Sequence, residues 1–185
     1  GFMAEFLCQY PRIDLTLWNA PSTEVHQAVI TRDVQFGLVV NPLPHPDLVM
    51  VPLFEDATDL FVRRGAAQDD AAARERIERG PLIYVEGLPQ SRQLLHYLAD
   101  EEIVPQKQLV CGNLELVKRL TLGGVGVGVI PRRVAAYGHT NELTRLHTTL
   151  PFVPDTIYLL YRSDLHRTRA ATRLRTALTD QGRQL

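Results

Sequence analysis

Residues 109–135, LVCGNLELVKRLTLGGVGVGVIPRRVA, contain a strand, a helix, a glycine-rich strand and the start of another helix, in that order. Asn113 is a suitable N-cap for the first helix, and the pair Gly123 and Gly124 ends it. Pro131 suits the first turn of the helix that follows. Strands that alternate with helices in this way predict a parallel sheet with helices packed on its faces.

The glycines of this stretch do not predict a nucleotide-binding loop. The segment 123–128, GGVGVG, lacks the spacing G-x-G-x-x-G. It also follows a helix and enters a strand, which is the reverse of the order in dinucleotide-binding folds. Alternating glycines instead remove side chains from one face of a strand. We therefore expect another backbone or a helix to pack closely against this strand.

The alternation of strands and helices extends from this stretch in both directions. We expect helices over residues 2–10, 22–32, 69–79, 91–98, 132–137 and 165–178, and strands over residues 13–17, 36–40, 48–54, 59–63, 82–85, 108–111, 125–129, 143–150 and 156–161. The last strand and helix are too few to fold alone and most simply return to the first unit. The sequence thus predicts an α/β fold of two lobes, with mostly parallel sheets and helices on both faces. Residues 1–64 plus 154–185 would form lobe I, and residues 65–153 would form lobe II.

The composition is that of a globular protein, with 45% hydrophobic residues and a net charge of -1 over 185 residues. No apolar run reaches membrane-spanning length and the N-terminus has no basic region, so we expect a cytoplasmic protein with no membrane partner. A nearly neutral chain has no field that attracts polyanions, so DNA contact by these residues is not expected. The basic cluster near the C-terminus is interpreted as a solvated helix face: Arg162, Arg167, Arg169, Arg173 and Arg175.

No catalytic or metal-binding pattern is found. None of the three serines lies in a G-x-S-x-G motif, and the six histidines include no H-E-x-x-H motif. Cys8 and Cys111 are far apart in apolar stretches and are expected to be buried, reduced thiols. The sequence therefore predicts no enzyme activity, no metal and no cofactor.

Polar residues at the starts of helices are the candidate binding site. The segments 21–23 and 89–91 each follow a strand and begin a helix, one in each lobe, and Asn113 begins a third helix. Such positions lie outside the carboxyl ends of strands, where N–H groups and the helix dipole favour a small anion. Plain helix capping explains any single position as well. The predicted ligand-binding residues are Ser22, Thr23, Asn41, Pro89, Gln90, Ser91 and Asn113.

Three segments resemble the effector-binding domain of LysR-type transcriptional regulators. They are residues 1–17 (GFMAEFLCQYPRIDLTL), residues 53–65 (LFEDATDLFVRRG) and residues 109–135. The resemblance implies a fold like the type 2 periplasmic binding proteins, with a small-molecule effector held between the lobes. Ser22 and Thr23 match the ligand-facing helix start of the first lobe. The cleft edge of the second lobe is matched by Gln90, Ser91 and Asn113.

The same resemblance implies partners and leaves alternatives open. A homodimer or homotetramer is expected, and DNA would be bound only through a winged helix-turn-helix that these residues do not contain. The resemblance implies that the family's first strand precedes Gly1. Glu102 stands where the family often has glycine. A solute-binding protein of a transporter would share the fold, and so would an enzyme on the same scaffold.

Overall fold

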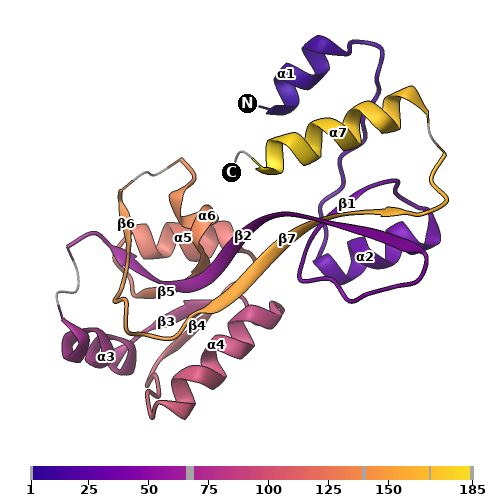
Figure 1. The fold of residues 1–185 in the computed structure, drawn as a ribbon. Helices are drawn as coiled ribbons and strands as arrows, with labels where there is room; N and C mark the ends of the chain where they lie inside the picture. Colours follow the sequence, from indigo (N-terminus) through magenta and orange to yellow (C-terminus); the bar gives the residue numbers. More distant parts are fainter. Residues whose placement is uncertain (1, 66–68, 139–140, 167, 184–185) are drawn as a thin grey trace. The chain divides into compact units, whose positions relative to one another are not determined.

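The computed structural model describes residues 2–65, 69–138, 141–166 and 168–183 (Figure 1). The chain forms two compact units, one of Gly1–Glu55 with Thr156–Leu185 and the other of Asp56–Asp155. It passes from one unit to the other twice, within strand β2 (Leu48–Arg63) and within strand β7 (Val153–Arg162). The first unit is therefore built from two separate stretches of chain, and the second unit from one continuous stretch.

The first unit contains a short antiparallel sheet with helices. Its elements are α1 (Phe2–Gln9), α2 (Ser22–Thr31), β1 (Gly37–Val40), the start of β2, the end of β7 and α7 (Arg169–Arg183). Strand β1 runs antiparallel to β7, with Val39 opposite Tyr158. Val25 and Val29 of α2 pack in one buried cluster with Val39. A helical apolar stripe thus covers the strand that follows it in sequence.

Residues 13–17 do not form the strand that their alternating pattern predicts. They have no regular secondary structure, and Leu17 is 77% exposed. A strand needs a neighbouring strand to satisfy its N–H and C=O groups. Among the strands of the described residues, none pairs with this segment. The prediction of a strand over residues 13–17 is therefore wrong.

The second unit contains a mixed sheet. Its further elements are α3 (Asp70–Arg79), β3 (Leu82–Tyr84), α4 (Pro89–Asp100), β4 (Gln108–Val110), α5 (Leu114–Leu122), β5 (Val127–Pro131), α6 (Arg132–Ala136) and β6 (Leu143–Arg145). The strand order is β2-β5-β3-β4, with β6 also paired to β2. Strand β3 is parallel to β4 and β5, whereas β2 is antiparallel to β5 and β6. Strand β2 is a single element of 16 residues where two shorter strands were expected.

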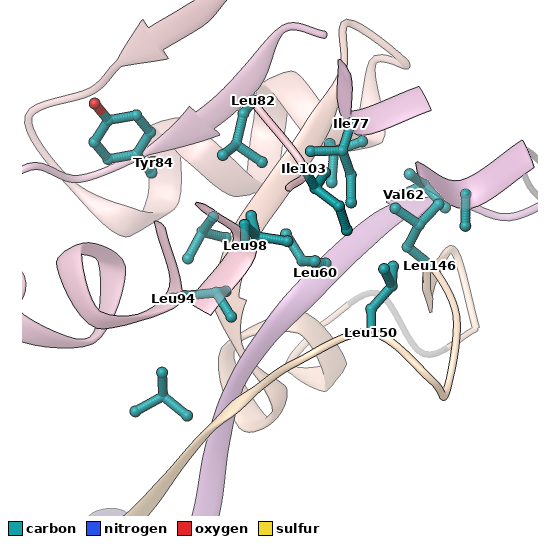
Figure 2. Packing of buried hydrophobic residues seen from close by; sticks show 14 residues of the cluster. Leu60, Val62, Ile77, Leu82, Tyr84, Leu94, Leu98, Ile103, Leu146 and Leu150 are labelled. Carbon is teal, nitrogen blue, oxygen red and sulfur yellow. The ribbon is translucent and has the colours of Figure 1, made fainter. Parts of the chain in front are cut away.

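Helices cover both faces of this sheet, because neighbouring residues of a strand point to opposite faces. Leu60 and Leu82 belong to the cluster under α3 and α4, which Figure 2 shows with Leu94 and Leu98 of α4. Phe61 belongs to the cluster under α5 and α6. Both faces of β3 are covered, which explains why Leu82, Ile83 and Tyr84 are all buried instead of alternate residues only.

The glycine-rich strand is packed as predicted. A Cβ atom on Gly126 would overlap the carbonyl oxygen of Pro81, and one on Gly128 would overlap Thr121 Oγ1 of α5. The close approach of a backbone and a helix confirms the packing interpretation. Glu102, after α4, has a φ of 61°, in the left-handed region that favours glycine. In the part of the chain that the structure describes, no helix is long and apolar enough to cross a membrane.

Candidate functional site

The start of α4 is tied to both strands that pass between the units. Gln90 Nε2 donates a hydrogen bond to Asp155 Oδ1 of β7 at 3.0 Å. Thr58 Oγ1 of β2 donates to Asp155 Oδ2, also at 3.0 Å. The side chains of Thr58 and Asp155 are buried. Gln90 is therefore held by a buried carboxylate, which fixes the position of the first turn of α4.

Ser91 follows directly and has an unusual environment. Its side chain is 1% exposed, and among the described residues its Oγ has no hydrogen-bond partner. Helix capping does not account for this hydroxyl, because the N-cap position of α4 is Leu88 and Pro89 occupies the first turn. A buried hydroxyl without a partner costs about 1–3 kcal/mol. Such a group in a native fold calls for a further polar partner.

Asn113 is the N-cap of α5. Its Oδ1 accepts a hydrogen bond from the backbone N–H of Leu116 at 2.9 Å. The exposed Asn113 side chain satisfies one of the free N–H groups of the helix, as the sequence suggested. Its amide group retains further donors and acceptor capacity for a ligand.

In the first unit, three of the predicted residues gather at the carboxyl end of β1. Ser22 begins α2, and its Oγ accepts a hydrogen bond from the Val40 N–H at 3.2 Å. Asn41 Oδ1 accepts from the Thr156 N–H at 2.8 Å, which joins the end of β1 to β7. Thr23 is exposed beside Ser22. The structure therefore brings Ser22, Thr23 and Asn41 together, and separately brings Pro89, Gln90 and Ser91 together.

A cavity in the first unit lies away from the predicted ligand-binding residues. The cavity, of about 800 Å³, is lined by residues 13–15, by Arg32 and residues 34–36, and by residues at the end of β7 and the start of α7. At its edge, Asp164 is bound by Arg162 and Arg32, and these hydrogen bonds hold the pKa of its carboxyl well below the usual range. None of the seven predicted residues lines this cavity. The cavity is lined mainly by apolar surface, and ion pairs of Asp164 lie at its edge.

A buried charge cluster in the second unit was missed by sequence reasoning. Asp59 lies within β2, is 0% exposed and contacts Arg132 and Arg145. The partners are 73 and 86 positions away in sequence, so spacing could not reveal them. The available signal was a carboxylate directly before the apolar run at residues 60–62 of β2, because a charge that is buried with such a run needs a partner.

The two cysteines differ in solvent exposure. Cys111 is buried as expected, and burial raises the pKa of its thiol. Cys8 is exposed, so the prediction of burial was wrong for this residue. It lies on α1, whose buried side holds Phe6, and Cys8 falls on the opposite side of the helix. Among the described residues, no group of His, Cys, Asp or Glu side chains could hold a metal ion.

Several basic side chains near the C-terminus contact carboxylates or aromatic rings. Arg162 is bound to Asp47 and Asp164, and Arg173 lies over the ring of Tyr10, 4.7 Å from its centroid. Arg175 lies over Tyr161 in the same way, at 5.7 Å. Arg167 falls outside the described residues. Arg162 lies in β7 and its side chain is 14% exposed, so the interpretation as a solvated helix face is wrong for this residue. Arg169 and Arg173 are exposed on α7, as that interpretation expects.

Comparison with known proteins agrees with this fold. The model of the LysR substrate binding domain matches residues 1–183. The transcriptional regulator YofA of Bacillus velezensis is 26% identical over 182 residues, which cover 96% of this chain and 60% of that protein. GltR of Bacillus subtilis is 24% identical over 147 residues, 79% of this chain and 49% of that protein. The chain thus spans about half to three fifths of these curated relatives.

A solved structure shows the same architecture. The regulatory domain of CcmR from Synechocystis PCC6803 superposes with a TM-score of 0.78 at 17% identity, covering 100% of this chain and 90% of that chain. The two-lobed α/β fold class is thereby confirmed, and so is the resemblance found in the sequence. With a family model that matches nearly the whole length, the chain belongs to the family of LysR substrate-binding domains.

Proposed function

We propose that this chain is the ligand-sensing part of a DNA-binding transcriptional regulator, and that it binds a small anionic effector without transforming it. The family match and the relatives, which are HTH-type transcriptional regulators, support this role. Contact with DNA is assigned to a segment outside these 185 residues, because their net charge is -1. The regulator would act in the cytoplasm, as a homodimer or homotetramer.

The observation that carries the proposal is the buried hydroxyl of Ser91, without a partner among the described residues, beside Gln90. An effector atom that accepts or donates a hydrogen bond there would satisfy it. The site lies in the first turn of α4, a helix of 12 residues, whose N–H groups and dipole favour a negative charge. The further contacts that we propose are Ser22, Thr23, Asn41, Pro89 and Asn113.

The relatives favour this proposal over the alternatives. A solute-binding role in transport would share the fold, but the matched proteins are regulators. An enzyme would need a nucleophile or an acid–base pair, and the sequence motifs for these are lacking. The CcmR domain, whose structure is a complex with 2-PG, supports the idea that a fold of this type can hold a small molecule.

A thermal-shift screen tests the proposal. The 185-residue chain is mixed with small carboxylates and phosphate esters, each paired with a neutral amide or alcohol of the same shape. A ligand at a hundredfold its Kd stabilises the fold by about 2.7 kcal/mol, which for this length is roughly a 5 to 10 °C rise in Tm. Anions should give the shifts and should be recovered unchanged. Shifts from the neutral partners alone would contradict an anionic effector, and conversion of the ligand would contradict a role without catalysis.

A further inference from the structure

The geometry points to a second binding site, within the second unit, for a small organic carboxylate with an apolar body. A cavity of about 340 Å³ lies between β2, α6 and β6, within the range of about 300–1,000 Å³ of small-molecule sites. Arg132 and Arg145 line it. None of the residues proposed for the effector lines it, so this inference does not rest on the proposed function.

The two arginines share one buried carboxylate. Arg132 donates to Asp59 Oδ2 through Nε at 3.0 Å and through Nη2 at 2.8 Å. Arg145 Nε lies 2.6 Å from the same oxygen, although its N–H is not directed at it. The other oxygen, Oδ1, accepts from the Leu60 N–H at 2.9 Å. Two guanidinium groups and one carboxylate leave one net positive charge at the cavity.

The guanidinium groups keep donors for a ligand. Arg145 Nη2 donates to the Leu150 carbonyl at 3.2 Å, whereas Nη1 of Arg145 and of Arg132 has no protein acceptor in the described residues. Arg132 is 43% exposed and Arg145 is 24% exposed. A bound anion would accept from these nitrogens and reduce the repulsion between two cations that share one oxygen.

An exposed aromatic ring holds both cations in place. The guanidinium carbons of Arg132 and Arg145 lie 4.8 Å and 5.2 Å from the centroid of Phe152. This cation–π arrangement restricts both side chains before a ligand binds. A preformed pair of donors costs less conformational entropy on binding than two mobile side chains.

The apolar residues that line the cavity beside the two arginines indicate which class of ligand fits. Phe61, Ala135 and Leu143 form a buried apolar floor, and no acidic side chain of the described part lines the cavity. An inorganic anion would leave this floor in contact with water. A carboxylate on a short aliphatic or aromatic body places its charge at the arginines and its apolar part on the floor.

Isothermal titration with phenylacetate as the probe tests the site. Phenylacetate should bind saturably and about tenfold or more tightly than the neutral phenylacetamide, because the amide lacks the charge-assisted hydrogen bonds. Arg132→Gln should weaken the binding of phenylacetate by a similar factor. Ala136→Phe adds bulk at the exposed rim of the cavity, keeps both arginines and Asp59, and should also weaken binding. The matched control is Arg119→Gln on α5, an exposed arginine paired with Glu115, which should leave the affinity unchanged.

Several results would overturn this site. Absence of saturable binding would do so, and so would equal affinity for phenylacetate and phenylacetamide. Inorganic phosphate that binds as tightly as phenylacetate would overturn the assignment to an organic carboxylate. Ser91→Ala should leave the titration unchanged. If Ser91→Ala abolishes binding while Arg132→Gln does not, the probe occupies the proposed effector site instead and the second site is rejected.

Discussion

Gln90 at the start of α4 and Asp155 at the junction of the two units on β7 are joined by a hydrogen bond of 3.0 Å. Asp155 also accepts from Thr58 on β2, so a single buried carboxylate links a helix start to both strands that pass between the units. Ser91, the residue after Gln90, is therefore held in a defined place although its own hydroxyl has no partner among the described residues.

Gln90→Ala should lower the free energy of unfolding by about 1.5–3 kcal/mol, because it removes a donor from a charged, buried acceptor. Urea denaturation at neutral pH measures this change. Gln93→Ala is the control on the same helix, since the Gln93 side chain is exposed and is hydrogen-bonded to Tyr97 of that helix. Its effect should stay within about 0.5 kcal/mol. Equal effects of the two substitutions would show that the link to Asp155 does not stabilise the fold.

Acid should destabilise the first unit through Asp164. Hydrogen bonds from Arg162 and Arg32 lower the pKa of this carboxyl in the folded state. A lowered pKa gives stability that is complete above the unfolded value of about 3.9 and is lost as the pH falls toward the folded value. Asp164→Asn should therefore be less stable than the parent at pH 7, and its stability should fall less steeply between about pH 4 and pH 2.

Denaturation curves over this pH range give the comparison. Asp180→Asn, which changes an exposed carboxylate on α7, serves as the control and should keep the parental slope. A parental slope in Asp164→Asn would mean that the ion pairs of Asp164 contribute nothing to the acid response.

The glycine-rich strand gives a steric prediction. Gly126→Ala places a methyl group on the Pro81 carbonyl, which also accepts the Val127 N–H at 3.0 Å, so neither group can move without breaking the start of β5. Overpacking of this kind costs about 1–3 kcal/mol or more. Gly112→Ala has open space around the new atom and should be nearly neutral. A similar Tm for both variants would contradict the close approach.

Local patterns predicted the helices better than the strand pairing. The N-cap at Asn113 and the glycines after α5 act within a few residues, so the sequence shows them directly. The segment 13–17 alternates as a strand should, yet pairing depends on a partner elsewhere in the chain. Residues 55–58 were read as a break between two strands, but β2 continues through them because Ala57 and Thr58 are buried.

In the candidate sites, too, local features could be predicted from the sequence, whereas contacts between distant residues could not. Ser91 could be proposed from its position after a strand at a helix start, and the structure adds that its hydroxyl is buried. The pairing of Asp59 with Arg132 and Arg145 joins three elements that are distant in sequence. The local sign is the position of Asp59 directly before the apolar run at residues 60–62, which indicates that the carboxylate needs a partner but not which residue that is.

The most direct test of the account is the effect of Ser91→Ala on effector affinity and on Tm together, measured with an anion found in the thermal-shift screen. If Ser91 contacts the effector, Kd should rise about fivefold or more, from one lost hydrogen bond of ~1 kcal/mol or above. The Tm without ligand should stay unchanged or rise, because a buried hydroxyl without a partner is removed. Ser163→Ala, at an exposed serine, should change neither quantity. A lowered Tm with unchanged Kd would show that Ser91 only supports α4, and the proposed effector site would be wrong.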